Sequence, residues 1–322
     1  MPSPRTDLYR LIDRNKRSTA FFIVLISLLL GAVGAALGWY FGWGWGFYAL
    51  FGVFIVAYNL ILYHNSARIA LAVNGARPAD PVEHRQLHNV VEEVAIAAGL
   101  PKPAVYVIPT PVPNAFATGR DPKHAAIAVT AGMLEMMNRD ELQGVVAHEL
   151  AHIRNYDILL ATVVAIIGGL IVLLRDVLLR GGLLFGGRRD RRSAGRGGGQ
   201  AGLIIAVVGI ALAIIAPLLV ALIRAALSRQ REYLADASGA YIVRNPHGLA
   251  SALEKLGASH ARLATASDAT AHMFIASPFA KDRAGIAGAF ASHPPLADRV
   301  RRLRALTLER PEEPTRQENS KS

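Results

Sequence analysis

Residues 145–157 read VVAHELAHIRNYD, and this stretch places two histidines four positions apart with a glutamate between them. On a helix, His148 and His152 project from one face, one turn apart. Their imidazole nitrogens can then reach a single zinc ion at about 2 Å. Glu149 lies beside them and can accept a proton from a zinc-activated water molecule. The stretch therefore predicts a hydrolytic zinc site, with His148 and His152 as metal ligands and Glu149 as the general base.

A third protein ligand is needed, because a catalytic zinc ion takes three and keeps one position open. The chain has no cysteine, so this ligand must be a histidine or a carboxylate. The extended form of the motif is excluded, since Asn155 and Ile158 stand where it requires a glycine and a third histidine. Glu232 is the favoured candidate, because Asp236 lies on the same helical face and can hydrogen-bond a ligand histidine. Glu254, in an amphipathic helix that bears a lysine, is a weaker alternative.

The sequence around the motif predicts a mainly α-helical domain with a small β-sheet. Asn138 and Glu141 have the spacing of a capping box, which would open the motif helix. The short apolar runs AVYVIP and AAIAVT are typical of strands, and NAFATGRDPKH lies between them. Helical patterning is present in VEHRQLHNVVEEVAIAAGL, REYLADASGAYIV and HGLASALEKLG.

Composition places part of the chain in lipid. Of its 322 residues, 52% are apolar and only 18% are charged, which is unusual for a purely soluble protein. Apolar segments predict up to four transmembrane or hairpin helices, at residues 19–37, 43–63, 158–174 and 201–223. Aromatic residues cluster between the first two segments, as they do at a bilayer surface: Trp39, Tyr40, Trp43 and Trp45. A cleaved signal peptide is the alternative for the first segment, but the second apolar run directly after it favours a membrane hairpin.

The distribution of charge predicts the side of the membrane. The formal net charge of +11 favours retention at a cytoplasmic face with anionic lipid over nucleic acid, for which no recognition module is present. The basic N-terminus is then cytoplasmic, and two crossings return the chain to the cytoplasm near His64, so the zinc helix is also cytoplasmic. The Gly/Arg-rich linker at residues 175–200 breaks this rule if both later segments cross. A hairpin that dips without crossing and an exception to the rule are the two alternatives.

Four segments in order resemble the membrane-bound HtpX-type zinc endopeptidases, relatives of the CAAX prenyl proteases: PNAFATGR, AHELAHIRNYDILL, REYLADASGA and SHPPLADRVRRL. The resemblance covers nearly the whole chain. It implies a gluzincin-type protease domain with one zinc ion per chain. It also implies quality control in the bacterial inner membrane, in which damaged or misassembled membrane proteins are cut during stress. The long Gly/Arg-rich linker and the extended tail depart from the family's pattern.

The resemblance also implies roles for single residues. The zinc ligands would be His148, His152 and Glu232, with Glu149 as the base. The segment NAFATG would be an exposed edge strand that binds extended substrate, through Asn114, Ala115, Phe116 and Ala117. His293 would stabilise the negative charge that develops on the scissile carbonyl. Arg299 would orient the site, and Asp157 would support a helix end or a zinc ligand.

The predicted organisation has six parts: a basic cytoplasmic N-terminus at 1–18, a transmembrane hairpin at 19–63, the first part of the catalytic domain at 64–157, a second apolar hairpin at 158–223, the second part of the catalytic domain at 224–309, and a disordered tail at 310–322. The predicted function is a zinc metalloendopeptidase that acts on unfolded or membrane-protein substrates, with its active site facing the cytoplasm. A CAAX-type prenyl-peptide protease is one alternative, disfavoured because such enzymes have more spans. A catalytically silent membrane scaffold is another, disfavoured because Glu149 is present. A small-solute transporter lacks support, since no apolar segment carries a buried charge.

Overall fold

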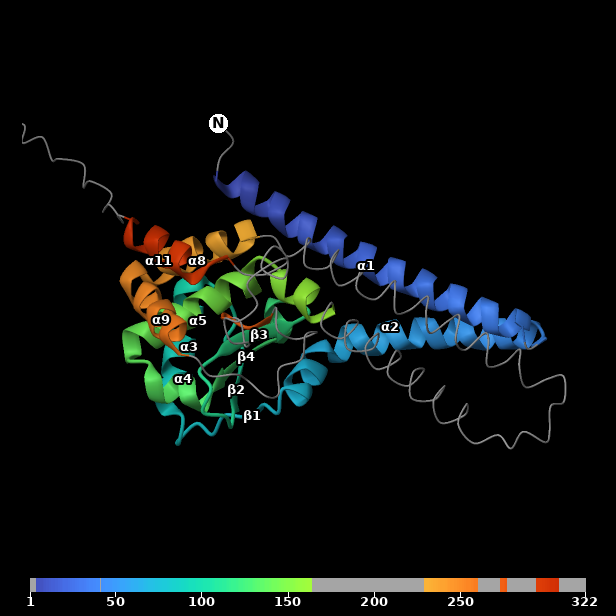
Figure 1. Cartoon of the computed structure of the whole chain (residues 1–322), viewed down its shortest axis with the longest axis horizontal. Helices are drawn as coiled ribbons and strands as arrows, with labels where there is room; N and C mark the ends of the chain where they lie inside the picture. The colour runs from blue at the N-terminus through green and yellow to red at the C-terminus, as the bar shows by residue number, and fades with distance from the viewer. Residues whose placement is uncertain (1–3, 41, 164–228, 260–272, 277–293, 307–322) are drawn as a thin grey trace, which may run out of the picture.

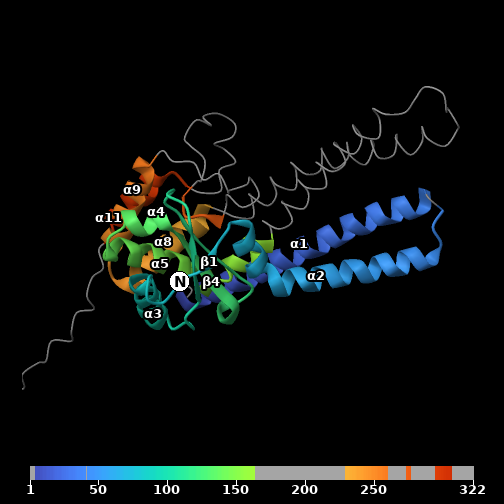
Figure 2. The ribbon, with the colours of Figure 1, turned by 90° about the horizontal axis from the view of Figure 1, so that it is seen from below.

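Two long helices lie side by side and extend away from the other labelled helices and strands (Figures 1 and 2). They are α1 (Pro4–Tyr40) and α2 (Trp45–Val73). The structure is a computed structural model, and it describes residues 4–40, 42–163, 229–259, 273–276 and 294–306. α1 already begins in the basic lead, and α2 continues past the predicted end of the second apolar segment at Tyr63.

Contacts between α1 and α2 are of the kind that holds helices together in a bilayer. A Cβ atom added at Gly34 would clash with the ring of Phe51, so the small residue lets the aromatic side chain approach the backbone of α1. Nearer the other end of the pair, the Asn59 side chain donates a hydrogen bond to Ser27 Oγ (2.9 Å). Small residues and side-chain hydrogen bonds are enriched where membrane helices meet.

The hairpin also presents apolar side chains outward. Seven large apolar residues described in α1 and α2 expose at least 60% of their surface: Phe21, Leu28, Trp39, Trp45, Leu50, Val53 and Val56. Two stretches, Ile12–Ala32 and Trp45–Val73, are long and apolar enough to cross a membrane. An extended apolar surface of this kind is unfavourable in water, so the hairpin is suited to lipid.

The predicted second hairpin falls largely outside the described residues. Residues 157–163 are helical, and Ile158, Leu160 and Val163 are buried. Thr162 in this helix shares a hydrogen bond between hydroxyls with Thr118 (2.9 Å). The start of the third apolar segment therefore packs against protein. The rest of that segment, the linker, the fourth segment and the tail at 310–322 lie outside the described residues.

A small mixed sheet has the strand order β1-β2-β4-β3. Its strands are β1 (Arg77–Pro78), β2 (Ala104–Ile108), β3 (Ala115–Gly119) and β4 (Ala125–Thr130). β2 and β4 run parallel, whereas β1 and β3 are antiparallel to their neighbours. β2 and β4 lie in the runs that the sequence indicated as strands, and β3 lies in the segment that the resemblance implied to be an edge strand. β1 was not predicted, because two residues that include a proline carry no strand pattern.

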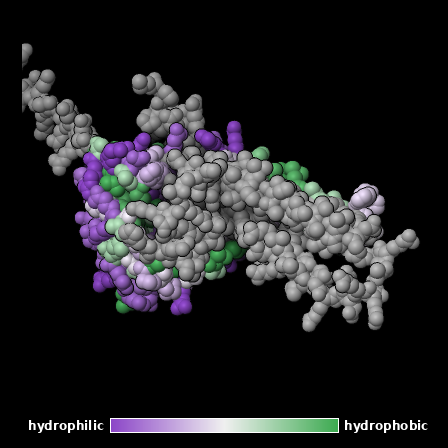
Figure 3. Space-filling model, in the orientation of Figure 1, coloured by the Kyte–Doolittle hydropathy of each residue, from purple (hydrophilic) through white to green (hydrophobic). Residues whose placement is uncertain are grey.

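Helices and sheet form a body at one end of the hairpin (Figure 1), and hydrophilic residues gather over its described surface (Figure 3). Its helices are α3 (Arg85–Ala98), α4 (Ala131–Met136), α5 (Arg139–Arg154), α8 (Arg229–Val243), α9 (Pro246–Ala258) and α11 (Leu296–Arg304), with a short 3-10 turn, η1 (Pro122–His124). α5 is central, in contact with α3, α8, α9 and β3, while α11 packs against α9. Alternate strand residues face opposite ways, as the pleat requires. Ala115 and Val129 join the core of α5, whereas Phe116 and Ala128 join a smaller cluster with the end of α2.

Candidate active site

α5 carries the motif. A capping box fixes the start of this helix, and its middle is buried. In the capping box, the Asn138 side chain accepts a hydrogen bond from Glu141 N–H, and the Glu141 carboxylate accepts one from Asn138 N–H, both at 2.9 Å. α8 approaches the motif through a glycine. A Cβ atom at Gly239 would lie 2.9 Å from His148 N, so α8 packs directly against the backbone of α5. This packing sets the distance between the two helices that carry the site.

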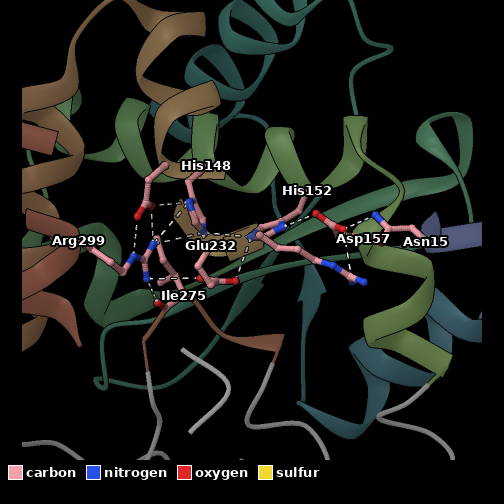
Figure 4. Close-up of polar contacts among 9 residues, drawn as sticks. Asn15, His148, His152, Asp157, Glu232, Ile275 and Arg299 are labelled. Atoms are coloured by element: carbon pink, nitrogen blue, oxygen red, sulfur yellow. Dashed lines mark hydrogen bonds and ion pairs between the residues drawn. The ribbon is translucent and has the colours of Figure 1, made fainter. Parts of the chain in front are cut away.

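His148, His152 and Glu232 form one group of potential metal ligands (Figure 4). One ligand atom from each lies within 4.8 Å of the others. The two Nε2 atoms are 3.1 Å apart, and Glu232 carboxylate oxygens lie 3.8 Å from His148 Nε2 and 3.5 Å from His152 Nε2. No second group of this kind occurs among the described residues. The alternative ligand, Glu254, instead pairs with Arg304 at the surface (2.9 Å).

Each histidine is held from its far side by a carboxylate. His148 Nδ1 lies 3.0 Å from Asp236 Oδ1, and His152 Nδ1 lies 3.1 Å from Asp157 Oδ2. A proton on Nδ1 that is shared with a carboxylate leaves the Nε2 lone pair available for a metal ion. Asp236 thus lies where its spacing from Glu232 indicated, and Asp157 contacts the second histidine.

Arg299 of α11 is completely buried beside this group. Its Nε and Nη2 donate to the Asp236 carboxylate (2.9 and 2.7 Å), and its Nη1 donates to the Ile275 carbonyl (2.9 Å). Burial alone would raise the pKa of Asp236, but the Arg299 charge and the hydrogen bonds from His148 and Arg299 outweigh it and lower that pKa. The carboxylate behind His148 therefore stays ionised.

Glu149 is buried, with 2% of its surface exposed. Burial raises the pKa of Glu149 to about 7, and the Glu232 carboxylate adds to the effect. His152 and a hydrogen bond from Ala117 N–H act in the opposite direction. A carboxyl group with a pKa near neutrality can both take up and release a proton.

The two histidines differ in their affinity for protons. Burial lowers the pKa of His148 to about 4. Burial acts in the same direction on His152, but the hydrogen bond to Asp157 and the surrounding carboxylates outweigh it and raise the pKa of His152 to about 9. The carboxylates around His152 therefore favour a positive charge at this side of the group, which also suits a bound cation.

β3 lies at the edge of the sheet, as the resemblance implied, but the expectation of an exposed strand is wrong. Asn114, Ala115, Phe116 and Ala117 are each no more than 4% exposed. The Ala115 carbonyl accepts a hydrogen bond from Ile275 N–H (3.0 Å). The Asn114 side chain also contacts both backbone groups of Ala276, with Nδ2 donating to the carbonyl (3.1 Å) and Oδ1 accepting from the N–H (3.4 Å). Residues 273–276 thus cover part of this edge.

The sequence did not point to two residues that contact Asp157, the carboxylate behind His152. Asn15 of α1 donates a hydrogen bond to Asp157 Oδ1 (2.5 Å), and Arg231 Nη1 lies 3.6 Å from the same oxygen. A weak signal existed for Asn15, because Asn15 and Thr19 are polar residues one turn apart at the start of an apolar segment. His293, with its implied role at the scissile carbonyl, lies outside the described residues.

Comparisons with known proteins identify the family of the chain. Residues 81–307 match the family described as peptidase family M48. A protease HtpX homolog of Caldanaerobacter subterraneus subsp. tengcongensis is 57% identical over 304 residues, which are 94% of this chain and 98% of that one. A second such homolog, of Thermoanaerobacter pseudethanolicus, is 54% identical over 307 residues, 94% of this chain and 99% of that one. The crystal structure of S. mikatae Ste24p aligns with 92% of this chain and 67% of its own, at 18% identity and a TM-score of 0.45. With the family match running from before the motif helix to beyond Arg299, this chain belongs to peptidase family M48.

Proposed function

We propose that this chain is a zinc-dependent endopeptidase of the bacterial cytoplasmic membrane, which cuts unfolded or damaged membrane proteins. The observation that carries the proposal is the group of His148, His152 and Glu232 with the buried Glu149 beside it. Membership of a peptidase family supports proteolysis, and the two apolar helices support a membrane setting.

The ligand group fits zinc. Two imidazoles and one carboxylate are a ligand set of catalytic zinc enzymes, and they leave a position open for a substrate or water. Calcium and magnesium prefer oxygen ligands, and Cu(I) prefers sulfur, so a nitrogen-rich group without cysteine disfavours these ions. The carboxylates behind both histidines add the outer support that zinc ligands usually have.

Glu149 moves the protons of the proposed reaction. When bound, a zinc ion would act as a Lewis acid that polarises the scissile carbonyl and activates a water molecule. Glu149 accepts the proton of the attacking water and then donates it to the leaving amine, which its raised pKa favours. His148, His152 and Glu232 would hold the ion. The carboxylates that contact the Nδ1 atoms of the two histidines leave the Nε2 atoms available as ligands.

An extended peptide is the substrate form that suits the site. Ala117 N–H of β3 reaches the Glu149 carboxylate, so the outer edge of β3 runs past the proposed base. A substrate would add to this edge as a strand, beside or in place of residues 273–276. Pairing through the backbone demands little of the substrate's sequence, which suits the removal of damaged proteins.

The position of the N-terminus supports an active site that faces the cytoplasm. Lys16 Nζ lies 4.5 Å from the ring centroid of Tyr156, directly after the motif helix. The basic end of α1 therefore shares a compartment with the site, and basic segments next to membrane helices are retained in the cytoplasm.

A cleavage assay on the purified full-length chain tests the proposal. The chain would be stripped with a chelator, reloaded with zinc, and offered unfolded casein, a destabilised membrane protein and a farnesylated peptide that ends in a CAAX sequence. We expect zinc-dependent cleavage of both proteins. Cleavage confined to the farnesylated peptide would favour the prenyl-peptide alternative, and a zinc-loaded chain that cuts none of the three would contradict the proposal.

A further inference from the structure

One amide connects the N-terminal helix with the metal-ligand group (Figure 4). Asn15 Nδ2 donates a hydrogen bond to Asp157 Oδ1 (2.5 Å) and another to the Asn155 carbonyl (2.9 Å). The second oxygen of Asp157 lies 3.1 Å from His152 Nδ1. These contacts run without a break from α1 to a side chain of the ligand group.

The surroundings of this amide show that α1 is seated on the body at this point. Asn15, Thr19 and Phe22 lie on one face of α1 and are all buried. The contact of Lys16 with the Tyr156 ring lies beside them. Tyr156 has a φ of 59°, a conformation that is unfavourable for a residue with a side chain and that persists only where neighbours hold it. α1 thus packs on the turn that follows the motif helix.

An asparagine matches this position chemically. Both partners of Nδ2 are acceptors, a carbonyl and a carboxylate, and the amide supplies two donors without adding charge. An aspartate of the same shape would place a second carboxylate against Asp157. A leucine of similar volume would offer no donor and would leave the buried carboxylate oxygen with a weaker set of partners.

We propose that Asn15 is a positioning residue for His152, through which the membrane helix α1 holds the metal centre in shape. The Asn15 amide donates a hydrogen bond to one oxygen of Asp157, and the Arg231 charge lies 3.6 Å from that oxygen. The other oxygen of Asp157 is then left to contact His152 Nδ1 (3.1 Å). The orientation of the His152 ring then depends on the seating of α1. The inference rests on the proposed function in one respect, that His152 binds zinc.

Zinc affinity measured by competition with a chelator tests this inference on the full-length protein in detergent. Loss of a partner behind a metal ligand typically weakens metal binding by about 10- to 100-fold, and Asn15 is one step further away. We therefore expect about tenfold weaker zinc binding in Asn15→Leu and a changed absorption spectrum of the cobalt-substituted protein. Thr19→Val is the matched control, because the Thr19 hydroxyl donates only within α1, to the Asn15 carbonyl (2.9 Å), and its zinc affinity should stay within about twofold of wild type.

Two further measurements separate positioning from a loss of folding. Asn15→Asp keeps the shape of the side chain but removes both donors, so it should lose zinc affinity at least as strongly. In a double-mutant cycle, Asn15→Leu should add little to Asp157→Asn if it acts through that carboxylate. Wild-type zinc affinity in Asn15→Leu, or additive effects in the cycle, would overturn the inference. A wild-type chain that binds zinc without cutting protein would contradict the proposed function but not this inference, because zinc affinity would still report on the role of Asn15.

Discussion

Glu232 is the ligand that the motif alone does not supply, and its replacement gives a direct prediction. Glu232→Ala removes the carboxylate that faces both Nε2 atoms, so the chain should lose zinc during dialysis against a weak chelator. Glu254→Ala is the matched control. Glu232 lies 3.6 Å from Arg299 Nη1, and Glu254 likewise pairs with an arginine, Arg304, but at the surface. Zinc content per chain, measured by atomic emission, should fall only in the first variant. Equal zinc retention in both variants would show that the third ligand lies elsewhere.

The state of Glu149 predicts how activity depends on pH. Its carboxylate must be ionised to accept a proton, and its pKa in the metal-free chain is raised to about 7 by burial. A bound cation favours the ionised form and moves that pKa down. With zinc saturating, kcat/KM for a fluorogenic peptide should therefore fall as pH falls, with a midpoint at or below about 7.

Zinc occupancy must be measured at each pH of that profile, because protons on His152 compete with the metal. A fall in kcat/KM that merely follows occupancy would not come from the base. A rate that increases as pH falls, at constant occupancy, is the result that the assigned role of Glu149 does not allow.

The contact between α5 and α8 makes a prediction about packing. In Gly239→Ala, the new methyl group would lie 2.9 Å from His148 N, against backbone that cannot rotate away. α8 must then move outward and carry Glu232 with it, at a cost of about 1–3 kcal/mol in unfolding free energy. Thermal unfolding and zinc affinity should both decline. Gly257→Ala in α9 is the control, since within the described part of the chain its methyl group would meet the flexible Leu296 side chain at 3.5 Å, an ordinary contact distance.

Local signals explain why some elements could be predicted from the sequence. α5 has a capping box at its start and two histidines four positions apart in its interior. The sequence therefore predicted both where this helix begins and which of its faces carries the metal ligands. β2 and β4 are short apolar runs between turn residues, which is the pattern of a buried strand. β1 has no such pattern, because its pairing with β2 comes from the position of the chain after α2.

The parts of the site that escaped prediction depend on contacts between distant segments. Asp236 and Arg299 were each expected to support the site, but they are 63 positions apart and nothing local to either indicated that they pair with each other. The hydrogen bond from Ile275 N–H to the Ala115 carbonyl also joins segments that are distant in the sequence. No local pattern indicates that residues 273–276 cover β3, and the strand was therefore expected to be exposed. His148, His152 and Glu232, in contrast, could be proposed because zinc chemistry itself requires a third ligand.

At the scale of the molecule, the described residues form an apolar hairpin with a body at one end, and this arrangement predicts which parts are accessible from each side of a membrane. The chain has no cysteine, so single cysteines can be introduced and labelled selectively. Gly44 is exposed at the far turn of the hairpin, and Val82 is exposed on the body. In intact spheroplasts, a membrane-impermeant maleimide should label Gly44→Cys but should reach Val82→Cys only after lysis. The opposite pattern would place the active site outside the cytoplasm.

The central claim is that one zinc site, with Glu149 as its base, makes this chain a protease. The measurement that tests it most directly compares wild type with Glu149→Gln, a substitution of nearly equal shape that cannot accept the proton. Zinc content and casein cleavage would be measured on the same preparations. We predict about one zinc per chain in both proteins and cleavage by the wild type alone. A Glu149→Gln protein that holds zinc and still cuts casein at the wild-type rate would contradict the claim.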